Sequence, residues 1–316
     1  MKTPASYTRR SFLGASAMAG TACLAGWPQA ARGVEGEPDK PFRIAFFTDI
    51  HARVEWGTPD AMARCADLIN AQKPDVVVCG GDLITDGFTL TSDQVNARWA
   101  AFRSALWDRL EAPVYTAIGN HDLVGVEPAD GSAPADNIRA DFLRFTGYPR
   151  TYYSVDVGGH HLVFLDPFEI TGDELRYRGM IGAEQLAWLR EDLSRVDRQT
   201  PLVLVVHMPL MTGFFQATRG ATEGAPPNRV VINSREVLQA CASHNLALVL
   251  QGHLHVNELL RWKKATFITG GAVCGQWWRG PWHETPEGFG LATLRADRVD
   301  WEYHSLGWQA RRPRDA

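Results

Sequence analysis

The chain has 316 residues, of which 45% are hydrophobic and 22% charged, and its formal net charge is -4. This composition is typical of a soluble globular protein with a sizeable core, long enough for one large domain or two small ones. It disfavours a dedicated nucleic-acid-binding protein, because such proteins carry a polybasic surface, and we expect no nucleic-acid polymer as a partner.

The start of the chain indicates an export signal. Arg9 and Arg10 precede a weakly apolar run over residues 13–27, an order typical of a twin-arginine signal peptide. The run is shorter than the roughly 20 apolar residues of a membrane-spanning helix. We therefore predict a signal at residues 1–31, the twin-arginine export machinery as a partner, and a periplasmic or secreted protein. Cys23 raises the alternative of a lipoprotein anchor, which Gly20 disfavours because a branched apolar residue is expected there.

The remaining chain alternates short apolar runs with helical patterns, and no segment of it is apolar enough to cross a bilayer. Strands are predicted at residues 42–48, 75–79, 113–118, 161–165, 202–206, 246–250, 266–269, 290–294 and 299–304. Helices are predicted at residues 59–71, 91–110, 183–196 and 234–243. Repeated strand–helix units predict an α/β fold with a largely parallel sheet under helices. The last three strands predict a second, more antiparallel sheet, and we expect one domain over residues 40–308.

Side chains that can ligate metals follow five of these strands. They are Asp49 and His51, Asp82, Asn120, His207, and His253 with His255. Because ligands bind beyond the carboxyl ends of parallel strands, we expect these side chains to meet. Aspartate and histidine ligate metals, and asparagine offers a carbonyl oxygen. Seven ligands exceed one tetrahedral ion but suit two ions about 3.5–4 Å apart that share a carboxylate, an arrangement that cleaves phosphate esters.

Glycines and long loops surround the ligand positions. Gly80, Gly81, Gly119 and Gly252 directly precede ligands, and glycine lets the backbone approach an ion closely. Three long loops, at residues 123–137, 208–230 and 275–289, are expected to rim the site. Four histidines outside the motifs are assigned no function: His160, His161, His244 and His304.

The blocks DxH, GD, GNHD, HxP and GHxH, in this order between residues 42 and 255, resemble the calcineurin-like metallophosphoesterase superfamily. FTDIH and GGDLITDG look most similar to its bacterial cyclic-nucleotide phosphodiesterase-like branch. The resemblance implies a four-layer α/β/β/α sandwich of two mixed sheets flanked by helices. It also implies one metal on Asp49, His51 and His255, a second on Asn120, His207 and His253, and Asp82 bridging both. His121 would be the catalytic histidine, with Asp122 orienting it.

The chemistry of such a site is hydrolysis. Paired cations neutralise phosphate oxygens and lower the pKa of a bridging water, which attacks phosphorus as hydroxide. His121 suits protonation of the leaving oxygen, because imidazole titrates near physiological pH; the alternative is that it only orients its neighbours. The donor set admits Fe, Mn or Zn as the two ions.

Two departures narrow the choice of relatives. Thr85 stands where purple acid phosphatases carry a tyrosine, so we predict no tyrosinate–iron colour. Asp86-Gly87 lacks the arginine of protein phosphatases. We predict an exported phosphodiesterase that acts on a small phosphorylated substrate. The alternatives are a phosphomonoesterase for small organic phosphates and an inactive metal-binding domain.

A tryptophan-rich segment follows the last ligand block. Trp277, Trp278, Arg279 and His283 are candidates for substrate binding, since aromatic rings form walls for bases or sugars and arginine meets phosphate. The alternative is a loop packed over the sheet. Cys65, Cys79, Cys241 and Cys274 show no paired spacing, and we predict no disulfide.

Overall fold

The computed structural model describes residues 40–312. The predicted signal at residues 1–31, including Cys23, lies outside the described residues. Among the helices of residues 40–312, none is both long and apolar enough to cross a membrane.

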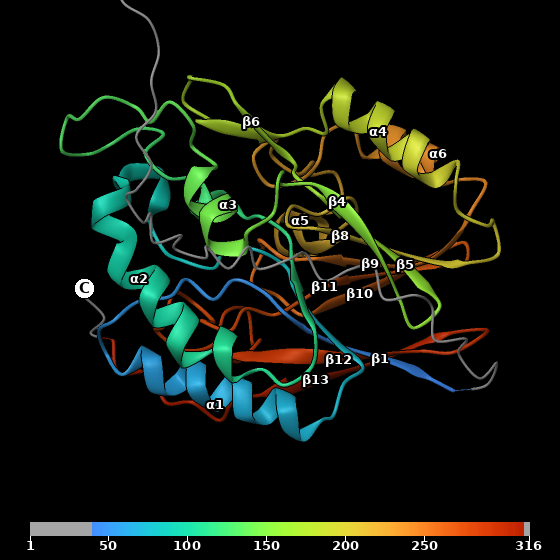
Figure 1. Cartoon of the computed structure of the whole chain (residues 1–316), viewed down its shortest axis with the longest axis horizontal. Coiled ribbons are helices and arrows are strands. Elements are labelled where there is room, and N and C mark those ends of the chain that lie inside the picture. Colours follow the sequence, from blue (N-terminus) through green and yellow to red (C-terminus); the bar gives the residue numbers. More distant parts are fainter. Residues whose placement is uncertain (1–39, 313–316) are drawn as a thin grey trace, which may run out of the picture.

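Two mixed sheets form the centre of the molecule (Figure 1). The first has the order β13-β12-β1-β2-β3, in which β1 (Phe42–Phe47), β2 (Val76–Cys79) and β3 (Val114–Thr116) are parallel. The second has the order β10-β11-β9-β8-β5-β4. Its parallel strands are β5 (His160–Leu165), β8 (Pro201–Val206), β9 (Asn245–Gln251) and β11 (Ala265–Thr269). Antiparallel strands complete the edges: β4 (Tyr153–Val157), β10 (Glu258–Trp262), β12 (Gly288–Leu294) and β13 (Val299–Ser305).

The expected sandwich of two mixed sheets flanked by helices is confirmed, but the division of the strands differs from the prediction. The last strands do not form a sheet of their own. Instead β11 pairs in parallel with β9, while β12 joins the first sheet beside β1. Alternating polarity shows that a strand has one buried face, but it does not show which edge the strand extends.

Helices cover the outer face of each sheet, and Figure 1 shows α1 and α2 on one side and α4 and α6 on the other. Their bounds are α1 (Thr58–Ala71), α2 (Ser92–Ala105), α4 (Ala183–Leu193) and α6 (Ser234–Ala240). The helix predicted at residues 91–110 ends at Ala105, before the 3-10 turn η2 (Trp107–Arg109). The predicted helices at residues 183–196 and 234–243 also end earlier. Elements not predicted are β4, β10, β6 (Phe168–Ile170), β7 (Tyr177–Gly179), α3 (Ala140–Thr146), α5 (Phe214–Arg219), η1 (Gly87–Thr89) and η3 (Asn120–Asp122).

The central strands are continuous apolar runs because both of their faces are buried. Phe46 of β1 packs between the sheets with Phe164 of β5 and Leu250 of β9. The next residue, Phe47, belongs to the core under the helices, together with Met62 of α1. Each such side chain contributes about 1.5–3 kcal/mol when it is fully buried. The layer between the sheets therefore fixes the position of one set of strand ends relative to the other.

His161 of β5 links its strand to β4 and to helix α4. Its Nδ1 lies 2.6 Å from Asp156 Oδ1 on β4, and its Nε2 lies 2.9 Å from Asp192 Oδ2 on α4. Burial disfavours the charged ring, but hydrogen bonds to Asp192 and Asp156 raise the pKa of His161 above its ordinary value. A raised pKa in the folded state stabilises the protein below the unfolded pKa of about 6.5, and this stability is lost as the pH rises through the folded pKa.

We therefore expect His161→Gln to lower the midpoint of thermal unfolding more at about pH 5.5 than at about pH 9. Circular dichroism at the two pH values measures the difference. An equal loss at both values would show that the ring carries no charge in the folded protein.

Candidate metal centre

The seven predicted ligands lie beyond the carboxyl ends of β1, β2, β3, β8 and β9, so both sheets contribute to one site. All seven side chains belong to residues that are at most 6% exposed. This placement agrees with the prediction that strand ends gather the motifs. The role of these residues as ligands stays a prediction.

Five of the seven have a left-handed backbone that non-glycine residues seldom adopt. Such a residue costs about 1–3 kcal/mol unless its surroundings hold it, and it turns the chain sharply after the strand. The residues are Asp49, His51, Asp82, His253 and His255, with φ between 44° and 71°.

Two glycines permit close approach of these turns. A Cβ atom on Gly119 would lie 2.1 Å from Asp82 Oδ1, and one on Gly252 would lie 2.7 Å from Asp49 Oδ2. Any side chain at either position would push a carboxylate out of the site.

The two carboxylates lie among the imidazoles. Asp49 Oδ1 is 3.2 Å from His255 Nε2 and 3.8 Å from His207 Nε2. Asp82 Oδ2 is 3.4 Å from His51 Nε2 and 3.2 Å from His207 Nε2. Asp82 thus lies between a histidine of one predicted ligand set and a histidine of the other, where a bridging carboxylate would have to be.

Several buried polar atoms of the site lack a hydrogen-bond partner within residues 40–312: Asp49 Oδ1, Asn120 Oδ1 and His207 Nε2. Buried polar atoms are rarely left unpaired, because each costs roughly 1–3 kcal/mol. Cations would satisfy all three atoms. The residues present therefore fit a pair of metal ions, and the mixture of oxygen and nitrogen donors admits Fe, Mn or Zn.

Backbone carbonyls orient three of the rings. His207 Nδ1 lies 2.8 Å from Gly80 O, His255 Nδ1 lies 2.7 Å from Gly275 O, and His253 Nε2 lies 3.0 Å from Asn228 O. A ring nitrogen that donates to a carbonyl carries the proton, so the other nitrogen of each ring is free to ligate. Asn228 and Gly275 belong to two of the loops that we expected to rim the site, and these two loops do contact it.

The two carboxylates and the burial of the site shift the pKa values of its histidines in opposite directions. Burial opposes protonation of His207, yet Asp82 and Asp49 raise its pKa to about 9. Burial lowers the pKa of His253 to about 3, helped by the charges of His207 and Arg229.

His121 lies beside these groups. One of its ring nitrogens is within 4.8 Å of ligand atoms of His51 and Asp82. Its Nδ1 accepts a hydrogen bond of 3.1 Å from the backbone N–H of Asp86. Because a backbone N–H can only donate, the ring proton must be on Nε2. Burial also lowers the pKa of His121, which keeps the ring neutral.

Asp122 contacts backbone amides of two turns. Its carboxylate accepts hydrogen bonds from the backbone N–H groups of Asp82 (3.0 Å), Leu83 (2.8 Å) and Gly119 (2.8 Å). It therefore ties the turn after β2 to the turn after β3. The Asp86 amide holds the His121 ring, and the prediction that Asp122 orients His121 stays a prediction.

Replacing Asp122 by asparagine puts an NH₂ group against backbone donors. A buried donor without an acceptor costs about 1–3 kcal/mol, so we expect Asp122→Asn to lower the free energy of unfolding by roughly that amount. Urea denaturation measures it. The exposed Asp60→Asn in α1 is the control and should change stability little; equal stability of the two variants would contradict the assignment.

The tryptophan-rich segment splits into two parts. Trp277 packs against the site, with its ring centroid 4.1 Å from that of His51, 5.0 Å from His121 and 5.4 Å from His255. Trp278 is 1% exposed, and its indole donates to His51 O at 3.0 Å. The prediction that Trp278 binds substrate is therefore wrong, because its ring belongs to the core under the turn.

The other two candidates of this segment contact different parts of the chain. His283 packs against Phe214 of α5, with ring centroids 5.0 Å apart. Arg279 lies near Arg312, whose pKa is lowered by burial and by the charges of Arg279 and Arg53. Their role in substrate binding stays a prediction.

Three neighbours of the site were not predicted. The amide of Asp86 fixes His121. Cys274 Sγ lies 3.9 Å from His255 Nδ1, and Phe168 has its ring centroid 6.0 Å from that of His207. Asp86 follows Thr85 in the GGDLITDG motif, so the sequence offered a signal that Asp86 lies near the site. Cys274 follows β11 and Phe168 follows β5, but neither belongs to a motif. Only the fold shows that they lie beside the site.

Comparison with known proteins gives a family and several relatives. The family model described as calcineurin-like phosphoesterase matches residues 42–257. Purple acid phosphatase 23 of Arabidopsis thaliana is 23% identical over 252 residues, which are 69% of this chain and 47% of that protein. Purple acid phosphatase 15 of the same plant is 27% identical over 163 residues, 51% of this chain and 27% of that protein. The chain thus spans less than half the length of these curated relatives.

Among solved structures, a dimetal phosphatase from Danio rerio has a TM-score of 0.59 at 17% identity, covering 84% of this chain and 97% of its own. A purple acid phosphatase from yellow lupin (Lupinus luteus) has a TM-score of 0.52 at 17% identity, covering 85% and 52%. An anchor protein of the inner membrane complex of Plasmodium also has a TM-score of 0.52, at 12% identity and with coverage of 84% and 85%. At such identities the likeness shows the fold alone.

Proposed function

The chain belongs to the calcineurin-like phosphoesterase family, and on that premise we propose that it is a dinuclear metal-dependent phosphoesterase, in particular a phosphodiesterase. One observation carries the proposal: seven predicted ligand side chains from five strand ends converge in one buried site, where Asp49 Oδ1, Asn120 Oδ1 and His207 Nε2 have no hydrogen-bond partner in the described part of the chain. Family membership alone would not suffice, since a protein described as an anchor shares the fold.

Two metal ions bound there supply positive charge on the phosphoryl oxygens and an activated water. The chain supplies the remaining parts. His121 holds its proton on Nε2, and its ring lies beside Asp82, so the proton can pass to the leaving oxygen. Trp277 covers the His51 side of the site and keeps bulk water from it. Arg53, which follows His51 by two residues, adds positive charge nearby, although Asp86 partly neutralises it at 2.9 Å.

The choice of a diester rests on the sequence likeness of FTDIH and GGDLITDG to the cyclic-nucleotide phosphodiesterase-like branch. The names of the relatives favour the second candidate, a phosphomonoesterase, because they are described as phosphatases. An inactive metal-binding domain is a third reading. It is disfavoured because His121, which an inactive domain would not need, is held in one tautomer.

Hydrolysis assays separate these candidates. Metal-stripped protein is loaded with Mn, Fe or Zn and given bis(p-nitrophenyl) phosphate or p-nitrophenyl phosphate. The proposal expects faster cleavage of the diester. Faster cleavage of the monoester would select the phosphomonoesterase, and no cleavage with any metal would select the inactive domain.

We also propose that the metals are bound without a tyrosinate ligand. Thr85, which stands three residues after Asp82, is buried, and its hydroxyl accepts a hydrogen bond from Arg53 at 3.2 Å. Iron-loaded protein should therefore show no strong visible absorption of the phenolate type. A purple colour would overturn this.

Export is the last part of the proposal. It is supported by Arg9, Arg10 and the apolar run after them. Cell fractionation of the full chain tests it: the parent should be found outside the cytoplasm, and Arg9→Lys/Arg10→Lys should remain inside. The same location for both would count against a twin-arginine signal.

A further inference from the structure

The end of the molecule opposite to the metal centre has a basic hollow. Its cavity of about 1030 Å³ is lined by the first residues of three parallel strands, Pro201 of β8, Asn245 of β9 and Ala265 of β11. The metal centre lies at the other ends of the same strands. Since β9 has seven residues, at about 3.3 Å each, roughly 20 Å separates the hollow from the metal centre.

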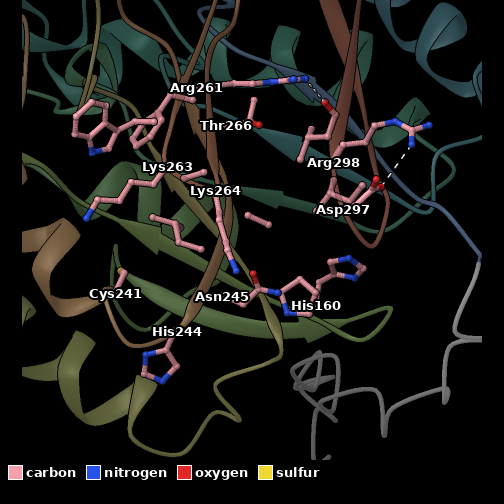
Figure 2. Close-up of a pocket in the computed structure, with 18 of the residues that line it drawn as sticks. His160, Cys241, His244, Asn245, Arg261, Lys263, Lys264, Thr266, Asp297 and Arg298 are labelled. Atoms are coloured by element: carbon pink, nitrogen blue, oxygen red, sulfur yellow. Dashed lines mark hydrogen bonds and ion pairs between the residues drawn. The ribbon is translucent and has the colours of Figure 1, made fainter.

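Cationic side chains outnumber acidic ones in the lining, and Figure 2 shows most of the cationic ones around the opening. Asp297 is the one acidic residue in the lining, while the chain as a whole is acidic with a net charge of -4. The cationic residues are Arg198, Arg261, Lys263, Lys264, Arg295 and Arg298, and all six are exposed. Positive charge is thus concentrated at this end.

Ion pairs neutralise only part of this charge. Arg295 Nε lies 2.9 Å and Arg298 Nε lies 3.0 Å from the carboxylate of Asp300. No ion pair within residues 40–312 involves Arg198, Lys263 or Lys264. Lys263 and Lys264 form the tip of the turn between β10 and β11, and both are exposed.

An exposed tryptophan stands next to these lysines. Trp262, the last residue of β10, is 58% exposed, more than any other large hydrophobic residue that the structure describes. Tryptophan beside lysine and arginine is the combination that settles at the headgroup level of a membrane, because the ring is amphipathic and the cations meet lipid phosphates.

We propose that this end of the protein docks on an anionic lipid surface, through Trp262 and the basic turns around it. A small anion enclosed in the hollow fits less well, because all six cationic residues are exposed. A specific phosphate site would instead hold the anion with buried hydrogen-bond donors. A flat anionic surface can contact the turns together. Docking in this way leaves the metal centre facing away from the bilayer, open to substrates in solution.

Sedimentation with lipid vesicles tests the proposal and does not depend on any enzymatic activity. The protein should sediment with vesicles that contain phosphatidylglycerol and should not sediment with pure phosphatidylcholine. Binding should fall as salt is raised, since salt screens exposed charges. Each basic residue near such a surface contributes about fivefold in affinity, so Lys263→Gln/Lys264→Gln should weaken binding about 25-fold.

The matched control is Arg219→Gln/Arg235→Gln, which removes two exposed charges from α5 and α6 at the end of the metal centre and should bind like the parent. Trp262→Ala should also weaken binding. Equal binding to neutral vesicles, or parent-like binding by the lysine variant, would overturn the proposal. Displacement by inorganic phosphate, at an ionic strength where chloride leaves the complex intact, would show a site for free phosphate instead.

Discussion

Asp82→Asn should lose both metal content and activity. The side chain keeps its size but loses the charge that lies 3.4 Å from His51 Nε2 and 3.2 Å from His207 Nε2, and so weakens both predicted metal positions together. Even a residue that only orients a ligand costs 10–100-fold in affinity or activity when it is replaced. For a bridging ligand we expect a fall in activity of more than about 100-fold.

Elemental analysis of the purified variant measures the metal content, and hydrolysis of bis(p-nitrophenyl) phosphate measures the rate. Asp75→Asn is the matched control, because Asp75 precedes β2 at the end remote from the site. It should keep two metals per chain and the parent rate. Two bound metals in Asp82→Asn would show that Asp82 does not bridge.

His121→Ala should keep the metals and lose rate. The ring is not among the seven predicted ligands, and its proton on Nε2 is set by the amide of Asp86. Removal of a general acid typically costs 10²–10⁴-fold, and the loss is greatest when the leaving group is a poor one. We therefore expect a small loss with p-nitrophenyl esters and a loss of about 10²–10⁴-fold with alkyl esters, which need a proton on the departing oxygen.

The dependence on the leaving group separates the two roles of His121. An orienting residue would slow all esters equally, whereas an acid slows those with basic leaving groups most. Metal content equal to that of the parent is the control that the site remains assembled. An equal loss with both classes of ester would favour the orienting role.

Much of this protein follows from its sequence. Apolar runs such as residues 202–206 end at a polar residue, and this local pattern predicts both the strand and the position of His207 at its carboxyl end. The alternation of strands and helices predicts helices outside the sheets. These features are local, because periodicity and turn residues depend only on neighbours in the chain.

The tertiary structure decided which segments that are distant in the sequence contact one another. Two sheets rather than one supply the site, since β1 to β3 belong to one sheet and β8 and β9 to the other. Asp122 holds backbone amides of the turn after β2, Asp86 fixes His121, and Trp277 rather than Trp278 reaches the histidines. Each depends on contacts between residues that lie 35 or more positions apart, and such contacts leave no periodic pattern.

The seven predicted ligands show the division most clearly. Their chemical types and their order along the chain are written in the sequence and predicted two metals. Their convergence, with five of them in a left-handed backbone, requires the packed core between the sheets to hold strained turns in place. The sequence by itself determined which atoms are available as ligands. Only the fold decided which of them meet, because burial in a shared core brings together strand ends that are far apart in the chain.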